Sequence, residues 1–177
     1  MRPSVIKRVG ADKCHPAWAD CMYQHILIPT DGSELSELAL REGMALAKAL
    51  GARVTALTVM TPFHVFTSNP GMIADTATQY RRDVEALANQ YLAVAKNIAQ
   101  VAAVPCDLVQ VEHEHPYRAI IETAQSRGCD VIEMASHGRR GISAIVLGSE
   151  TVKVLTHSTV PVIVCRRARP ASLSEIR

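Results

Sequence analysis

Two glycines and two hydroxyl residues near the end of the chain have a spacing suited to binding an anion. Gly138 follows the apolar run 130–135, and nine residues separate it from Gly148 and Ser149. A glycine lets backbone N–H groups approach a phosphate closely, and a helix that begins at Ser149 presents unpaired N–H donors and partial positive charge. Ser149 and Thr151 add hydroxyl donors. Two such surfaces, separated by an arch of chain, would suit a polyphosphate.

A purely structural interpretation of these residues stays open. Gly138 and Gly148 are also suited to a turn and a helix cap, and Ser149 to an ordinary N-cap. The P-loop pattern, GxxxxGK followed by Ser or Thr, is missing, as is the dinucleotide pattern GxGxxG after the first apolar run. From the residues alone, phosphate binding and turn formation carry equal weight.

The elements that must position these residues follow from the periodicity of the chain. Short apolar runs, bounded by turn residues, predict buried strands at 24–30, 53–60, 106–112, 130–135 and 159–166. Helical patterns lie between them, at 33–50, about 74–101, 116–127 and from 148 or 149 onward. Such alternation requires parallel strands joined by right-handed crossovers. We therefore predict an α/β fold, an open five-stranded parallel sheet with helices on both faces.

Ligands of such a sheet bind outside the carboxyl ends of the strands, where the strand order reverses. The loop 29–33 follows the first strand and the loop 135–151 follows the fourth, so the two loops would face one crevice if these strands are neighbours. Asp31, in the first loop, could accept hydrogen bonds from a ribose or an adenine amino group, or hold Mg²⁺ through water. It could equally form a turn with Gly32.

Composition limits the classes of protein and partner. A chain of 177 residues, 48% of them hydrophobic, can bury one core and is expected to form one domain. A net charge of +2 with dispersed Lys and Arg indicates neither a nucleic-acid nor a membrane partner. We find no apolar stretch of the roughly 20 residues that a membrane span needs, and no signal-peptide core. Five scattered cysteines are typical of reduced thiols, so we expect a cytoplasmic protein.

Three separated motifs resemble the universal stress protein family in their order and spacing. They are YQHILIPTDGSELSELAL, HPYRAIIETA and CDVIEMASHGRRGISAIVLGSETVKVLTHSTVPVIVCR. The resemblance runs from about Met22 to Arg166 and implies a Rossmann-like sheet with the strand order 3-2-1-4-5. It divides the chain into an N-terminal extension over 1–21, which we expect to be disordered, a domain over 22–167 and a C-terminal tail over 168–177.

The resemblance includes the branch of the family that binds ATP without a P-loop. That branch carries a glycine, two residues, a second glycine, nine residues and then Gly-Ser or Gly-Thr. Gly138, Gly148 and Ser149 match this pattern, whereas Ala135 replaces the first glycine. Because alanine is the smallest change, we expect binding to be retained. It would be weaker if the methyl group crowds the ribose or α-phosphate, or if the position needs a positive φ.

Carried over residue by residue, the resemblance predicts a site for ATP, with or without Mg²⁺. Pro29, Thr30 and Asp31 are expected beside the base and ribose, and Val59 and Met134 near the adenine. The residues expected at the phosphates are Gly138, Gly148, Ser149, Glu150 and Thr151, with Ala135 and His137 beside them. For Glu150, only the backbone N–H, and not the carboxylate, is expected to contact the phosphates. Arg139 offsets the phosphate charge or belongs to a solvated basic turn, and both interpretations stay open.

The last strand predicts an assembly. Val160, Val162 and Val164 alternate with Pro161 and Ile163, so this strand is apolar on both sides although we expect it at the sheet edge. An uncovered apolar edge is an association site. The resemblance implies pairing of this strand across a two-fold axis, and we predict a homodimer.

Three functions stay open. We favour a stress-response or signalling module whose ATP occupancy alters its contacts with a second copy or with unknown protein partners. A dimeric adaptor that binds no nucleotide is the alternative that Ala135 favours. A slow ATPase or autokinase is less favoured, because His137, Ser149 and Thr151 are its only nearby candidates and lack a nucleophile–base–acid set.

Two features of the sequence are not explained by the predicted fold and nucleotide site. Glu133 lies within the fourth strand, where burial on both faces disfavours a carboxylate. His113 and His115 could ligate a metal, although a solvated strand end is the more frequent use of such a pair. We assign no metal site.

Overall fold

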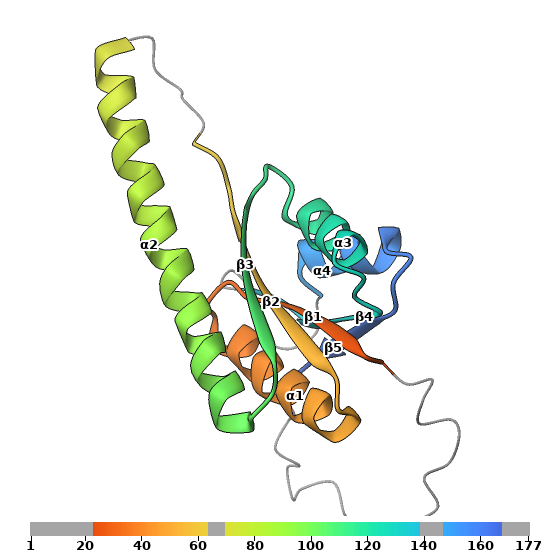
Figure 1. Cartoon of the computed structure of the whole chain (residues 1–177). Helices are drawn as coiled ribbons and strands as arrows, with labels where there is room; N and C mark the ends of the chain where they lie inside the picture. Colours follow the sequence, from red (N-terminus) through yellow and green to blue (C-terminus); the bar gives the residue numbers. More distant parts are fainter. Residues whose placement is uncertain (1–22, 64–69, 139–146, 168–177) are drawn as a thin grey trace, which may run out of the picture.

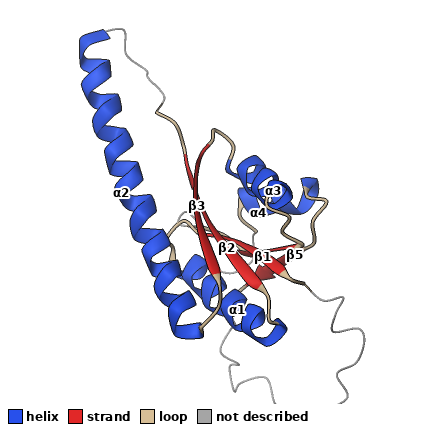
Figure 2. Cartoon of the chain, viewed as in Figure 1, coloured by secondary structure: helices blue, strands red, loops and turns tan. Residues whose placement is uncertain are grey.

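The structure, a computed structural model, describes residues 23–63, 70–138 and 147–167, with the backbone alone for 70–76. The predictions for the extension 1–21 and the tail 168–177 concern residues outside these ranges. The elements, in chain order, are β1 (His25–Pro29), α1 (Glu34–Leu50), β2 (Arg53–Met60), α2 (Pro70–Ala102), β3 (Cys106–Glu112), α3 (Pro116–Ser126), β4 (Val131–Ala135), α4 (Ser149–His157) and β5 (Val162–Cys165) (Figures 1 and 2).

All five strands are parallel, in the order β3-β2-β1-β4-β5. Figure 1 shows α1 and α2 on one face of the sheet and α3 and α4 on the other. The predicted α/β fold and its strand order are therefore confirmed. No helix in the described ranges combines the length and the apolar character needed to cross a membrane.

Helix α1 shows how local sequence sets an element. The Ser33 side chain accepts a hydrogen bond from the Ser36 N–H at 3.2 Å and caps the first turn. At the other end, Gly51 adopts the left-handed conformation, with φ of 69°, and its N–H reaches the carbonyls of the last turn. Both ends lie where the sequence predicts them.

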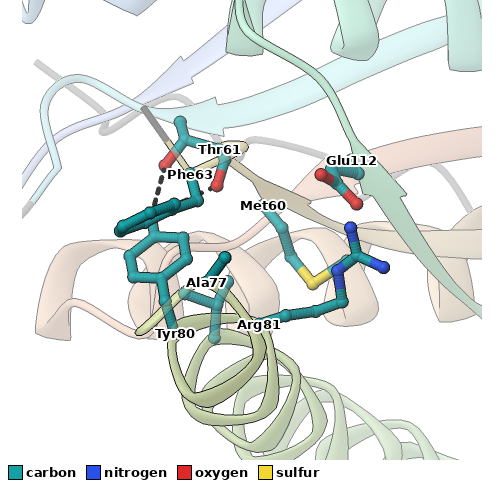
Figure 3. Close-up of a pocket in the computed structure, with 8 residues that line it drawn as sticks. Met60, Thr61, Phe63, Ala77, Tyr80, Arg81 and Glu112 are labelled. Atoms are coloured by element: carbon teal, nitrogen blue, oxygen red, sulfur yellow. Dashed lines mark hydrogen bonds between the residues drawn. The ribbon is translucent and has the colours of Figure 1, made fainter. Parts of the chain in front are cut away.

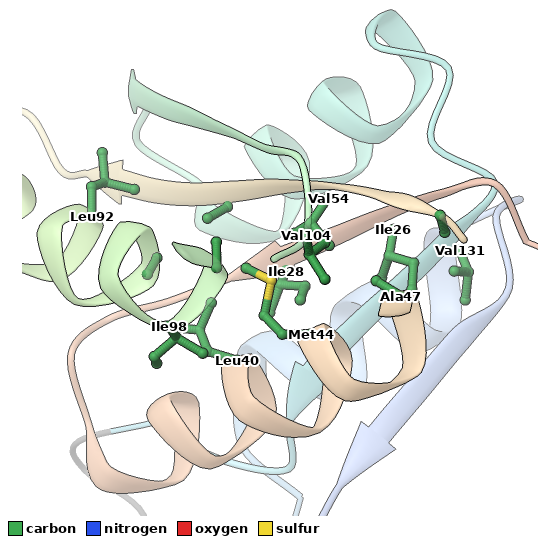
Figure 4. Packing of buried hydrophobic residues seen from close by; sticks show 14 residues of the cluster. Ile26, Ile28, Leu40, Met44, Ala47, Val54, Leu92, Ile98, Val104 and Val131 are labelled. Atoms are coloured by element: carbon green, nitrogen blue, oxygen red, sulfur yellow. The ribbon is translucent and has the colours of Figure 1, made fainter. Parts of the chain in front are cut away.

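The larger core cluster lies between the sheet and the pair α1 and α2 (Figure 4). Ile26 and Ile28 of β1 and Val54 of β2 face it from the sheet, and all three are fully or almost fully buried. Leu40 and Met44 meet them from α1. A second cluster packs α3 and α4 against the opposite face. Strand β1 thus lies in a sheet covered on both sides, as its continuous apolar run predicts.

Two elements differ from the prediction by more than one residue at a boundary. Helix α2 begins at Pro70, one turn earlier than expected. Strand β5 is limited to Val162–Cys165, shorter than the predicted 159–166. Pro161 has no N–H to donate, although its carbonyl accepts from Ile132 at 2.9 Å. Just before it, the Ser158 hydroxyl bonds both backbone groups of Val160, which forms a turn instead of a strand.

Glu133 is the exception among the side chains that β4 buries. It faces α1, where Gly43 provides the space for it: a Cβ at that position would lie 2.9 Å from Glu133 Oε2 and 2.5 Å from the Ile28 Cδ1 atom. Only 2% of Glu133 is exposed. The absence of a side chain at position 43 therefore allows the helix to approach the strand.

Gly43→Ala is expected to lower the free energy of unfolding by about 1 to 2 kcal/mol, the overpacking cost less the gain in helix propensity. Chemical denaturation measures this change. The exposed Ala45 of the same helix provides the control, because Ala45→Gly should cost about 1 kcal/mol through propensity alone. A Gly43→Ala variant more stable than the wild type would contradict the close packing of α1 against β4 at this position.

Candidate functional site

The site lies where the strand order reverses, between β1 and β4. Strand β1 pairs with β2 on one side and with β4 on the other, so the loops that follow β1 and β4 emerge side by side. A Cβ on Gly138 would collide with Asp31 Oδ2. The two loops therefore face each other, as predicted, and Gly138 approaches the Asp31 carboxylate so closely that a side chain at position 138 would displace it.

Hydrogen bonds brace the first loop. The Thr30 hydroxyl lies 3.1 Å from the Ser36 hydroxyl and accepts from the Gly32 N–H at 3.3 Å, while Asp31 Oδ1 accepts from the Ser33 N–H at 3.1 Å. Gly32 has φ of 74°, and a Cβ there would collide with the Tyr91 ring of α2. This loop is thus held by its own turn and by a helix distant in sequence.

The second loop rejoins the sheet at Gly148. Its N–H donates to the Ser136 carbonyl at 2.7 Å, and a Cβ on Gly148 would lie 3.0 Å from His137 Cα. Gly148 is also the N-cap of α4 and has no side chain with which to cap the helix. The start of α4 is therefore placed against the residues that follow β4, with backbone N–H groups as its donors.

The Thr151 hydroxyl, in the first turn of α4, is used in a hydrogen bond within the protein. Its hydroxyl donates to the Ala135 carbonyl at 3.0 Å, and only 3% of the residue is exposed. This bond ties α4 to the end of β4. A hydroxyl used in this way is a poor nucleophile candidate, which leaves Ser149 and His137 from the predicted set.

The Glu150 carboxylate is held by other groups of the protein. Its Oε2 accepts from the Tyr117 N–H at 2.9 Å, in the first turn of α3, and its Oε1 pairs with Lys153 at 2.7 Å. The negative charge is thus matched by a helix N-terminus and an ammonium group. This geometry agrees with the expectation that the backbone of Glu150, and not its carboxylate, serves an anion.

The loops open onto a cavity of about 720 Å³, a size typical of sites for small molecules. Its walls are the ends of β1, β2 and β4, the start of α4 and one side of α2. The lining residues are Pro29, Thr30, Asp31, Ser36, Leu57, Thr58, Val59, Met60, Thr61, Tyr80, Val84, Leu87, Ala88, Tyr91, Pro116, Ile120, Met134, Ala135, His137, Gly138, Gly148, Ser149, Glu150 and Thr151.

A smaller hollow of about 50 Å³ adjoins the cavity at the end of β2 (Figure 3). Tyr80 and Phe63 place their ring centroids 5.1 Å apart there, and the Tyr80 hydroxyl donates to the Thr61 carbonyl at 3.2 Å. Figure 3 shows Arg81 of α2 directed toward Glu112 at the end of β3. The two hollows share residues of β2 and α2, so they form one recess.

A model of the universal stress protein family matches residues 22–166. The chain belongs to the universal stress protein family. Universal stress protein MJ0577 of Methanocaldococcus jannaschii is 28% identical over 158 residues, which cover 82% of this chain and 96% of the relative. The solved structure of MJ0577 superposes with a TM-score of 0.69 at 27% identity, over 84% of this chain and 99% of that one.

Two further solved structures of universal stress proteins share the fold and hold adenine nucleotides. One is a complex with cAMP, at 22% identity and a TM-score of 0.61, over 82% of this chain and 98% of that one. The other, from Archaeoglobus fulgidus, is a complex with dAMP, at 19% identity and a TM-score of 0.58, over 81% and 98%. At these identities the comparison establishes the fold alone.

With the exception of Arg139, every residue that the family resemblance places in the site lines the cavity. Arg139 lies outside the described ranges. Ala135 has a negative φ, because the only described residue other than glycine with a positive φ is Ala103. Its side chain packs with Leu35 and Ala39 of α1. In this family member, position 135 therefore needs no glycine for its backbone conformation.

Sequence reasoning missed the wall that α2 contributes. Tyr80, Val84, Leu87, Ala88 and Tyr91 line the cavity at a spacing of four, three, one and three residues, which defines one face of a helix. The pattern was visible in the sequence. The spacing alone defines one face of a helix and does not say what that face covers, and only the crossing of α2 over the strand ends turns it toward a cavity.

Thr151→Val is expected to lower the free energy of unfolding by about 1 to 3 kcal/mol, because it removes a buried hydrogen-bond donor at nearly constant shape. Thr156 provides a matched control on the same helix, since its hydroxyl bonds the Val152 carbonyl at 2.8 Å at an exposed position. Thr156→Val should change stability by less than about 0.5 kcal/mol. Equal losses in the two variants would contradict the tie between α4 and β4.

Proposed function

We propose that the cavity binds ATP or a related adenine nucleotide, and that this universal stress protein acts as a nucleotide-dependent stress-response or signalling module in the cytoplasm. The observation that carries the proposal is the cradle made by Gly138 and Gly148 beside the first turn of α4. Both glycines line the cavity, side chains at these positions would meet Asp31 and His137, and the helix start has no side-chain cap. An anion is the ligand that such a cradle recognises.

The phosphates would lie between Gly138 and the N-terminus of α4. Ser149 is exposed at the helix start, where its hydroxyl and the N–H groups of the first turn can donate to phosphate oxygens. Among the described residues that line the cavity, none is Lys or Arg. Recognition by this part of the chain would therefore depend on backbone and hydroxyl donors, as the missing P-loop lysine predicts.

The adenine and ribose would lie toward β1 and β2. Leu57, Val59 and Met134 offer an apolar surface to a planar base, and Tyr80 and Tyr91 close the cavity from α2. The solved universal stress proteins in complex with cAMP and dAMP support an adenine nucleotide as the class of ligand. The Thr30 hydroxyl lies 3.1 Å from the Ser36 hydroxyl, and the Thr30 N–H donates to the Leu57 carbonyl. Thr30 would therefore contribute through its carbonyl oxygen, which has a second lone pair beside the one that accepts from the Thr58 hydroxyl.

Magnesium fits the charge of this site. The Asp31 carboxylate lies at the Gly138 contact, so a bound polyphosphate would meet a negative charge there. A divalent cation between the carboxylate and the phosphates would offset the repulsion, and Mg²⁺ is usually held in this way by carboxylates together with phosphate oxygens. Asp31 is the residue that would orient it.

Gly138→Asp is expected to weaken ATP binding by at least about a hundredfold, equivalent to roughly 2.8 kcal/mol, because it fills the cradle and adds a charge beside Asp31. Isothermal titration of ATP with Mg²⁺ into the purified chain measures this. Gly128→Asp adds the same charge after α3, where the glycine has φ of 64° and open space around it, and should bind as the wild type does.

The same titration, followed by analysis of the nucleotide and of free phosphate, separates the three functions. If ATP binds and is recovered unchanged, the result supports the signalling module. Steady release of phosphate would instead support the slow ATPase or autokinase. A folded wild-type chain that binds no ATP at millimolar concentration would contradict the proposal and favour the adaptor. Circular dichroism of each variant shows whether it is folded.

We also propose that the module is a homodimer that pairs through β5. This strand is at the edge of the sheet, and its apolar residues Val162, Ile163 and Val164 are only half-buried. On the neighbouring α4, Val152 and Leu155 are 45% and 43% exposed. An apolar edge strand beside exposed apolar side chains favours association.

Val164→Lys is expected to convert the dimer to a monomer, because a lysine on an edge strand opposes pairing with a second strand. Sedimentation equilibrium measures the mass of each species. Val101→Lys is the control, since this residue is 82% exposed near the end of α2, a helix that packs on β2 and β3 at the other edge of the sheet from β5. A dimer that survives the β5 substitution, or a monomeric wild type, would contradict this interface.

A further inference from the structure

Three ligating side chains converge on the α1 face of the sheet, away from the nucleotide cavity. Glu133 of β4, Cys165 of β5 and Glu42 of α1 each place a carboxylate oxygen or a sulfur within 4.8 Å of the other two. The Cys165 thiol donates to Glu133 Oε1 at 3.1 Å. None of the three lines the cavity described above. Within the described ranges, this is the group of three that qualifies as a cation site by geometry.

Glu133 supplies an independent reason to expect a ligand. It is 2% exposed, and its Oε2 has no hydrogen-bond partner in the described part of the chain. A buried carboxylate oxygen without a partner costs free energy, and such groups need an explanation. The Gly43 backbone makes room for the carboxylate but provides no partner for it.

Without a cation, the cluster disfavours the anionic forms of its groups. Cys165 is 5% exposed, and its sulfur lies 3.1 Å from Glu133 Oε1. If all three were ionised, the two carboxylates and the thiolate would repel each other where α1, β4 and β5 meet. A divalent cation would reverse this balance, because it stabilises a thiolate and neutralises the carboxylates.

We propose that Glu42, Glu133 and Cys165 form a zinc site. Tetrahedral bonds of about 2.0 to 2.3 Å place ligand atoms about 3.5 Å apart. The three ligand atoms lie within 4.8 Å of one another, with Cys165 Sγ 3.1 Å from Glu133 Oε1, so side-chain adjustment would bring them to that spacing. One thiolate with oxygen ligands favours Zn²⁺ over Mg²⁺ or Ca²⁺, which take oxygen alone. Water would complete the coordination. On binding, the thiol releases its proton to solvent, and the sulfur lone pair forms the bond to the metal.

The placement assigns the site a structural role. Its ligands come from α1, β4 and β5, so the metal would link the edge strand to the helix that begins at the first cavity loop. Glu42 is exposed, which gives the ion a path from solvent, while the other two ligands are buried. The proposal does not rest on nucleotide binding, and either site can fail without the other.

The test uses Co²⁺ as a probe with the full chain, kept reduced and free of other metals. The wild type should bind one ion per chain and show thiolate-to-cobalt charge-transfer absorption that Zn²⁺ abolishes by displacement. Cys165→Ser should lose the absorption. Glu133→Gln and Glu42→Gln should each weaken binding by at least about tenfold, the loss typical for groups that support a metal.

Other cysteines serve as controls. Cys106→Ser, on β3, and the double change of Cys14 and Cys21 to Ser should both retain the absorption. If Cys165→Ser fails to fold, the exposed Glu42→Gln decides, since it changes no buried group. The proposal is overturned if the wild type shows no absorption at millimolar Co²⁺. It is also overturned if the absorption persists in folded Cys165→Ser, or depends on Cys14 and Cys21.

Discussion

The contact between Gly138 and the Asp31 carboxylate sets the geometry on which the site depends. It joins two loops that are more than one hundred residues apart, and it leaves no space for a side chain at position 138. Pairing of β1 with β4 brings the loops together, and the bond from Thr151 to the Ala135 carbonyl holds α4 behind them. A helix start, a glycine and a carboxylate thus converge on one point at the carboxyl ends of the strands.

The same sheet carries a second polar feature on its α1 face. Side chains of β4 alternate between the two faces, so Met134 faces α3 and the cavity while Glu133 faces α1. A carboxylate in a strand covered on both sides conflicts with burial unless another group compensates for it. Gly43 resolves the steric part of this conflict, and the proposed cation resolves the electrostatic part.

Most of the fold follows from local patterns. The capping residues Ser33 and Gly51 mark both ends of α1 correctly, because capping depends on neighbours within one turn. The prediction was less accurate for β5, since its first residues combine apolar character with Pro161, and the missing N–H outweighs the apolar pattern. Gly138, Gly148, Ser149 and Thr151, which the glycine spacing singled out, all line the cavity.

By itself, the sequence determined the elements, the parallel sheet and, through its three motifs, the family, because periodicity, capping and motif spacing are properties of the chain. Only the tertiary structure decided which atoms meet. Tyr91 covers Gly32 because α2 crosses the strand ends, and Glu133 reaches Cys165 because β4 and β5 pair in register with α1 above them. Contacts between distant residues depend on crossing angles and strand register, and no local pattern specifies these.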